Sequence, residues 1–121
     1  MSETSLVYES IPEFTEAEME KAIAEDDFEK LIFVPLFASL YYEDRSYAEK
    51  ICIKLVAHSH FNVRAMAIEG FEHIARIDGK LDKETVKPII EKALKDESEF
   101  VRDKAEWTQD ATKQYLKWKY K

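Results

Sequence analysis

The amino-acid sequence predicts an all-α protein built around a repeated two-helix unit. The motif V-R-x-x-A occurs at residues 63–67 and again at residues 101–105, an offset of 38 residues. At the same offset residues 51–56 fall on residues 89–94, with apolar residues at matching positions. The chain has only two glycines and three prolines, so it needs few turns, which favours helices. Self-similarity at this period is typical of stacked helix pairs.

Length and composition indicate one ordered domain. A chain of 121 residues with 45% apolar residues can bury one core and is too short for two. The N-terminus lacks the basic and apolar segments of a signal peptide, and no apolar run approaches the roughly 18 residues of a membrane span. We therefore expect a cytoplasmic protein. Its one cysteine, Cys52, lies in an apolar stripe and is expected to be a buried hydrophobic residue.

The first predicted helix begins at a capping box. Thr15 and Glu18 have the required spacing, and Phe14 can pack on Met19 one turn later. We expect this helix to end near Glu25. It has a narrow apolar side and a surface rich in acids: Glu13, Glu16, Glu18, Glu20 and Glu25.

The second predicted helix runs to about residue 43 and is capped by Asp26 or Asp27. It is apolar almost all round, which predicts a helix covered by neighbours on most sides. Pro35 within it predicts a kink, because proline cannot donate the helical hydrogen bond. A strand at residues 31–37 is the alternative, but the proline and the lack of a partner strand argue against it.

The third and fourth predicted helices form the first repeated pair. Ser46 and Glu49 have capping-box spacing at the start of the third helix, which ends near residues 58–59. The fourth follows a turn at residues 60–62 and stops at the Asp-Gly pair of residues 78–79. Their apolar stripes have spacings of three and four residues: Ala48, Ile51, Cys52, Leu55 and Val56, then Val63, Met66, Ala67, Gly70, Phe71 and Ile74.

The fifth and sixth predicted helices form the second pair. The fifth starts after Asp82 or at Thr85, and the later start is favoured because it places Pro88 in the first turn. The sixth begins near Ser98 and runs towards Trp118. The expected buried residues are Val86, Ile89, Ile90, Ala93 and Leu94, then Val101, Ala105, Thr108 and either Ala111 or Thr112, with Trp107 and Tyr115 on the opposite flank.

This pattern resembles the HEAT-like repeat families over about residues 46–116. The resemblance implies a short, right-handed α-solenoid of about three antiparallel helix pairs, at residues 1–45, 46–80 and 81–118, the first fitting only in outline. In such repeats an aspartate six positions before the arginine helps to join neighbouring units. Asp96 and Arg102 match that spacing and are expected to pair, whereas His58 replaces the acid before Arg64.

Charge is unevenly distributed along the chain. Residues 1–49 contain 13 acids and three bases, a balance of −10, whereas residues 50–121 contain 12 acids and 15 bases, a balance of +3. An acidic half repels nucleic acid and attracts basic surfaces. We therefore expect a basic protein as partner, and neither nucleic acid nor membrane.

Signatures of catalysis are missing from the sequence. It has no glycine-rich phosphate loop, no H-E-x-x-H and no G-x-S-x-G, so we expect no enzyme and no cofactor. A metal site formed by His58 and His60 with Asp96 or Glu97 is the alternative, but histidines two apart in a turn are more often polar turn residues.

Two further groups of side chains are candidates for a functional site. The first group has the spacing of a solvated helix face and consists of Glu69, Glu72 and His73. HEAT-like DNA glycosylases use a basic groove with aromatic residues, and a small patch of this kind is formed by Lys104, Trp107, Lys113 and Lys117. The acidic half argues against that function.

The strongest candidate for partner binding is the segment at residues 41–47. It combines three tyrosines, two acids and an arginine, and tyrosine and arginine are enriched at interface centres. Covering of helix ends by Tyr41 and Tyr47 is an equal alternative. The predicted partner-binding residues are Tyr41, Tyr42, Glu43, Asp44, Tyr47, Glu16, Glu20, Asp26 and Asp27. The C-terminal aromatics Trp107, Tyr115, Trp118 and Tyr120 either cap the stack, which is favoured, or form a second contact patch.

Small size and acidity make the chain similar to the HEAT-like immunity proteins that bacteria produce against their own nuclease toxins, including those of contact-dependent growth inhibition. This resemblance implies an inhibitor that binds and occludes a basic toxin domain. The alternative is an adaptor or scaffold module that binds a peptide or an enzyme subunit.

Overall fold

The computed structural model describes residues 11–120, which form helices joined by short turns, without strands in that range. The chain is thus all-α over the described residues, as predicted. The helices are α2 (Glu16–Glu25), α3 (Phe28–Leu31), α4 (Val34–Tyr41), α5 (Arg45–Leu55), α6 (Phe61–Asp78), α7 (Lys83–Ala93) and α8 (Glu99–Leu116).

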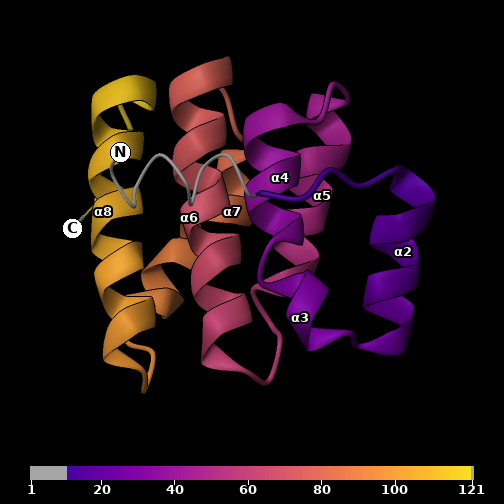
Figure 1. The fold of residues 1–121 in the computed structure, drawn as a ribbon. Coiled ribbons are helices and arrows are strands. Elements are labelled where there is room, and N and C mark those ends of the chain that lie inside the picture. Colours follow the sequence, from indigo (N-terminus) through magenta and orange to yellow (C-terminus); the bar gives the residue numbers. More distant parts are fainter. Residues whose placement is uncertain (1–10, 121) are drawn as a thin grey trace, which may run out of the picture.

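The helices form two layers. Figure 1 shows α4, α6 and α8 side by side, with α5 and α7 behind them and α2 at the edge far from α8. Helix α6 is central, because it packs against α4, α5 and α8. Helix α4 continues in the direction of α3, and each later helix reverses the direction of the one before it, so α3, α6 and α8 all begin at one end of the molecule and the turn after α4 lies at the opposite end (Figure 1).

The boundaries of the helices repeat at the 38-residue offset of the sequence motif. Helices α5 and α7 each have 11 residues, α6 and α8 each have 18, and each second copy begins 38 residues after the first. Each of the longer helices follows a polar cap, since the side chains of His60 and Ser98 accept from backbone N–H groups of the first turn. Helices α2 to α4 do not follow this period.

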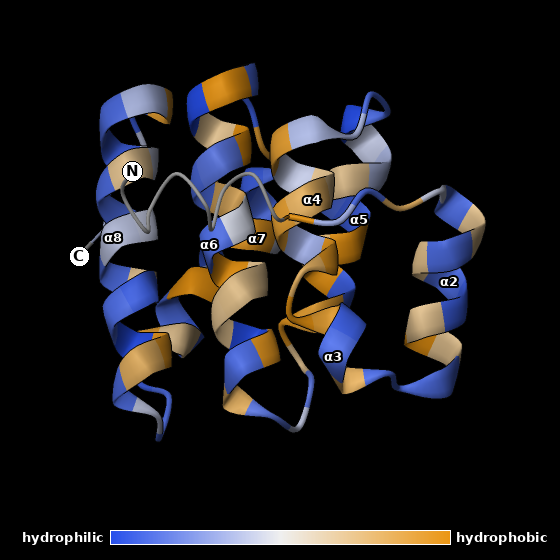
Figure 2. Cartoon of the chain, viewed as in Figure 1, coloured by the Kyte–Doolittle hydropathy of each residue, from blue (hydrophilic) through white to orange (hydrophobic). Residues whose placement is uncertain are grey.

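The core lies between the layers and is continuous from α2 to α8. The alanines of the two repeated motifs, Ala67 and Ala105, are both fully buried. A Cβ atom added at Gly70 would collide with Sγ of Cys52, so the glycine allows α6 to approach α5 closely. Cys52 is buried as predicted, and burial raises the pKa of its thiol to about 12. Figure 2 shows hydrophobic colouring on α4 and on the segment that joins it to α3, in the middle of the molecule.

The predicted first helix is confirmed at both ends. The Thr15 hydroxyl accepts from the Glu18 N–H at 3.1 Å, and the Glu18 carboxylate accepts from the Thr15 N–H at 2.8 Å. The helix ends at Glu25, where Asp26 takes the left-handed conformation with φ of 51° and its N–H reaches back to α2. Asp26 therefore ends α2 instead of starting the next helix.

The single kinked helix predicted for the following residues is wrong. The chain breaks into α3 and α4, with Pro35 in the first turn of α4. There the missing N–H costs nothing, because the first N–H groups of a helix have no helical acceptor. Asp27 precedes α3 without a side-chain cap, and α4 ends at Tyr41, before the expected residue 43.

Three helix ends also differ from the prediction. Helix α5 is capped by Asp44, whose carboxylate accepts from the Tyr47 N–H at 3.0 Å, and not by Ser46; it also ends earlier, at Leu55. Helix α7 begins directly after Asp82, so Pro88 lies inside it. Pro88 is the sixth of the 11 residues of α7 and removes one helical hydrogen bond, the one to the carbonyl of Glu84.

Candidate functional site

The tyrosines of residues 41–47 hold α2 against the rest of the protein. The Tyr42 hydroxyl donates to Glu16 Oε1 at 3.1 Å, and the Tyr47 hydroxyl donates to the Glu20 carboxylate. The two rings pack edge to face with centroids 5.5 Å apart. Burial, together with the bond to Glu20, raises the pKa of Tyr47. The structure thus brings the two predicted tyrosines and the two predicted glutamates together, but in contacts within the chain.

The other predicted residues of this turn face solvent. Tyr41 is 58% exposed, and Glu43 and Asp44 are exposed. Asp44 caps the N-terminus of α5, whereas the Glu43 side chain lies outside the core. Arg45 is drawn inward: it binds the Asp78 carboxylate at 2.9 Å and donates to backbone carbonyls at the end of α4.

Asp26 and Asp27 lie at the opposite end of α2 from the tyrosine turn (Figure 1). Asp26 has a side chain that is 70% exposed, with Oδ1 2.6 Å from Nε2 of His58. Asp27 pairs with Lys30 at 3.7 Å. The predicted residues therefore form a strip along α2 and beyond both of its ends, and not a compact patch.

This strip carries almost only negative charge on its surface. Of the three bases among residues 11–49, Arg45 is bound by Asp78, Lys30 is paired with Asp27, and Lys21 is exposed. We call the strip the acidic edge, defined by the exposed residues Glu16, Glu18, Glu20, Glu25, Asp26, Glu29, Glu43 and Asp44.

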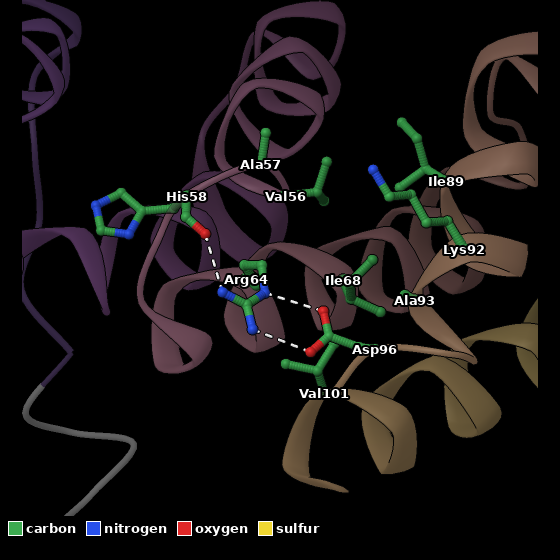
Figure 3. Close-up of a pocket in the computed structure, with 10 residues that line it drawn as sticks. All are labelled: Val56, Ala57, His58, Arg64, Ile68, Ile89, Lys92, Ala93, Asp96 and Val101. Atoms are coloured by element: carbon green, nitrogen blue, oxygen red, sulfur yellow. Dashed lines mark hydrogen bonds and ion pairs between the residues drawn. The ribbon is translucent and has the colours of Figure 1, made fainter. Parts of the chain in front are cut away.

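A bidentate ion pair joins the two repeated units. Arg64 of α6 donates through Nε and Nη2 to the two carboxylate oxygens of Asp96, each at 3.0 Å (Figure 3). The same guanidinium donates to the backbone carbonyls of His58 and Ser59. The bond to Arg64 is the largest of the contacts that lower the pKa of Asp96. The predicted side-chain pair of Asp96 with Arg102 is therefore wrong, since Arg102 donates to the Asp96 backbone carbonyl at 2.7 Å.

The same connection recurs one unit earlier with the roles exchanged. Asp26 and His58 are 32 residues apart, as are Arg64 and Asp96, and adding 38 to the first two numbers gives the second two. In the first pair the turn residue, His58, is the basic member and Asp26 is the acidic one. In the second pair the turn residue, Asp96, is acidic and Arg64 is basic. His58, which departs from the repeat pattern, thus still joins its unit to the preceding segment.

A pocket of about 430 Å³ lies beside the ion pair, between α5, α6, α7 and the start of α8. Figure 3 shows the guanidinium of Arg64 and the carboxylate of Asp96 at its lower side. The rest of the lining is mainly aliphatic: Val56, Ala57, Ile68, Ile89, Ala93 and Val101, with the stem of Lys92. His58, whose ring contacts Asp26, completes the lining, and the pocket offers space for a small apolar group.

The two histidines of the turn at residues 58–60 form hydrogen bonds within the chain. The His60 N–H donates to Nδ1 of His58 at 2.9 Å, and Nδ1 of His60 accepts from the Asn62 N–H at 3.1 Å, capping α6. These contacts and the one to Asp26 engage both ring nitrogens of His58 and one of His60. Within residues 11–120, no group of three or more histidine, cysteine or acidic side chains is arranged to hold a metal ion.

A buried charged cluster was missed by the sequence analysis. The expected solvated face of Glu69, Glu72 and His73 is wrong, because Glu72 is 4% and His73 7% exposed. His73 lies between the two acids, with Nε2 3.0 Å from Glu69 and Nδ1 2.8 Å from Glu72. Lys104 of α8 binds Glu69 at 2.7 Å, and Arg76 binds Glu72 at 3.1 Å.

The protonation of this cluster follows from its contacts. Burial lowers the pKa of His73, but the hydrogen bonds and charges of Glu69 and Glu72 outweigh burial and raise it. Burial raises the pKa values of the two glutamates, and His73 with Lys104 or Arg76 brings them below the ordinary value. Both ring nitrogens of His73 face acids of its own helix, which leaves the ring poorly suited to proton transfer, and the ion pair of Glu69 with Lys104 joins the cluster to α8. The i, i+4 spacing of Glu69 with His73 and of Glu72 with Arg76 was the available signal.

The C-terminal aromatics differ in burial. Trp118 is 7% exposed, and the Tyr120 hydroxyl lies 2.8 Å from that of Thr112, so both pack on the end of the helix stack. Trp107 and Tyr115 are 48% and 41% exposed on α8.

Comparison with protein family models, with curated proteins and with solved structures found no match. None of the helices described is long and apolar enough to cross a membrane.

Proposed function

We propose that this protein is an inhibitor that binds a basic protein domain through its acidic edge, in the manner of HEAT-like immunity proteins that neutralise nuclease-type toxins. In this proposal the chain is a single-domain, cytoplasmic, short right-handed α-solenoid of about three HEAT-like helix pairs. It has no catalytic role and no cofactor. A toxin active site that binds phosphates must be basic, and an acidic protein can cover it in place of the nucleic acid.

The concentration of exposed acids along α2 and beyond its ends is the observation that carries this proposal. The acids are held at fixed positions, since Tyr42 and Tyr47 hold Glu16 and Glu20 and the capping box holds Glu18. A preorganised charge strip loses little conformational freedom on binding. Its field also steers a basic partner, so association should slow steeply with added salt.

The test is isolation of the partner from the native host, followed by an inhibition assay with the purified pair. Glu25→Lys with Glu43→Lys should weaken inhibition and slow association, while leaving the melting temperature unchanged. Asp44 is left intact because its replacement would remove the cap of α5. The matched control is Glu106→Lys with Asp110→Lys, the same charge change at exposed positions of α8. Equal effects of the two double variants, or a partner that is acidic, would refute the proposal.

An adaptor or scaffold module is the second candidate, favoured by the exposed aromatic side chains of α8. Trp107 and Tyr115 lie on the helix farthest from α2, outside the acidic edge (Figure 1). An adaptor would bind its partner without changing that partner's activity. The inhibition assay therefore separates the two functions.

A further inference from the structure

Four aromatic rings contact one another in a line at the end of the molecule where α3, α6 and α8 begin. The ring centroids of Phe28 and His60 are 4.4 Å apart, those of His60 and Phe61 4.8 Å, and those of Phe61 and Phe100 6.2 Å. We call these four residues the aromatic row. The three phenylalanines are 38%, 42% and 38% exposed, so the row is a surface and not part of the core.

The apolar surface continues from the row along α8. The ammonium group of Lys104 lies 5.5 Å from the Phe100 ring centroid and 5.2 Å from that of Trp107, and Glu69 holds it there. Exposed apolar residues scattered singly need no explanation, whereas contiguous ones mark interaction sites. Aromatic side chains are also enriched among the residues that dominate binding energy.

Exposed acids outnumber bases close to the row in the chain, where the lysines are Lys30, Lys95 and Lys104 and the last is bound by Glu69. Arg64 and Arg102, the nearest arginines in sequence, are turned towards Asp96 and the turn carbonyls, and Lys30 is paired with Asp27. The exposed acids close to the row in the chain, on α2, α3 and the start of α8, are Glu25, Asp26, Glu29, Glu97, Glu99 and Asp103.

This charge decides which occupant fits. Phosphates of a nucleic acid and a second copy of the row would both be repelled by the acids. Arginine and lysine side chains fit both features, because their stems pack on aromatic rings while their cationic groups reach nearby carboxylates. The row is also continuous with the acidic edge, since Asp26 belongs to the edge and contacts His58, two residues before His60.

We propose that the aromatic row is the anchor of the docking surface and takes a basic, amphipathic segment of a protein partner. This inference rests on the proposed function and deepens it: the acidic edge steers the partner, and the row holds it. The energetic centre then lies at the opposite end of α4 from the tyrosine turn, whose Tyr42 and Tyr47 are engaged with α2.

The experiment uses two dye-labelled synthetic peptides as probes, one with arginines and leucines at helical spacing and one with the same arginines and with serine in place of leucine. Affinity for the full chain is measured by fluorescence anisotropy at several salt concentrations. Phe61→Ser with Phe100→Ser should weaken binding of the amphipathic peptide about tenfold or more. The control, Ile77→Ser, removes one exposed apolar side chain at the other end of α6; it is compared with single Phe100→Ser and should change the affinity less than about twofold.

A second pair of variants guards against misfolding. Phe61→Tyr with Phe100→Tyr keeps both rings and should retain the affinity, and thermal melts of all variants should remain close to that of the parent chain. If the serine variants melt early, the tyrosine variants and single Phe100→Ser decide the question. Equal weakening by Ile77→Ser and Phe100→Ser, or no weakening by loss of the phenylalanines, overturns the inference.

The two proposals fail in different ways. If the amphipathic peptide binds with strong salt dependence but ignores the phenylalanines, the acidic edge keeps its role and the row is not the anchor. If neither peptide binds with salt dependence, and Glu25→Lys with Glu43→Lys has no effect on inhibition of the isolated partner, the proposed function falls and the inference falls with it.

Discussion

The ion pair between Arg64 and Asp96 allows a quantitative test of how the two repeated units are joined. Both side chains are about one-sixth exposed, at 15% and 16%. Breaking a fully buried pair costs about 3–5 kcal/mol, and an exposed pair contributes about 0–1 kcal/mol. Asp96 also accepts from the Ser98 N–H at 2.9 Å. We expect Asp96→Ala to lower the free energy of unfolding by about 2–3 kcal/mol, between these limits.

A double-mutant cycle separates the pair from these other contacts. Arg64→Ala should cost about 2 kcal/mol, and its coupling with Asp96→Ala should be about 1–2 kcal/mol, measured by urea denaturation. The matched cycle uses Arg102→Ala, since Arg102 binds the Asp96 backbone carbonyl, which alanine retains. Its coupling with Asp96→Ala should be under about 0.5 kcal/mol. Strong coupling to Arg102 with none to Arg64 would refute the reasoning.

Three further predictions concern stability. Ala67→Asp and Ala105→Asp should each unfold or strongly destabilise the protein in thermal melts, because both sites are fully buried and offer the carboxylate no partner; unchanged melting would contradict the packing described. The raised pKa of His73 gives stability that is complete below its unfolded pKa near 6.5 and is lost as pH rises through the higher folded pKa, so His73→Gln should flatten the pH dependence of unfolding above pH 6.5. Tyr47→Phe with Tyr42→Phe should speed hydrogen exchange in α2 and leave α6 unchanged, and exchange that is equal to that of the parent chain would show that the hydroxyls do not hold α2.

The helix pairs of residues 45–116 could be predicted because local rules and burial agree there. Apolar residues at spacings of three and four mark the side of a helix that faces its own pair, and caps such as Ser98 mark where it starts. The break before Pro35 was not predictable from periodicity. A helix that is apolar on all sides has no polar face whose position along the sequence could shift. Its pattern of apolar residues therefore continues unchanged through a two-residue interruption.

The candidate site was predicted only in part, because periodicity reports one interface of a helix. Helix α6 is covered on several sides, so Glu72 and His73 are buried and Glu69 is bound by Lys104 of α8, although all three fall outside the apolar stripe of α6. Phe61 and Phe100 were likewise overlooked. Each is the first or second residue of its helix, where sequence patterns begin, and their contact joins residues 39 positions apart.

The way α2 is attached connects the fold to the proposed function. Its buried side chains are Met19 and Ala22, Ile23 packs on the core while partly exposed, and its polar attachments are Glu16 to Tyr42, Glu20 to Tyr47 and, just beyond its end, Asp26 to His58. A carboxylate that accepts one tyrosine hydrogen bond keeps further lone pairs, so it can also accept from a partner's arginine or lysine. Under the proposed function, the contacts that hold the acids in place leave them able to bind a partner, and the tyrosines would act on binding through the position of α2. Loss of the two hydroxyls should then weaken partner binding by releasing α2, whereas loss of the rings at Phe61 and Phe100 should weaken it with α2 still in place.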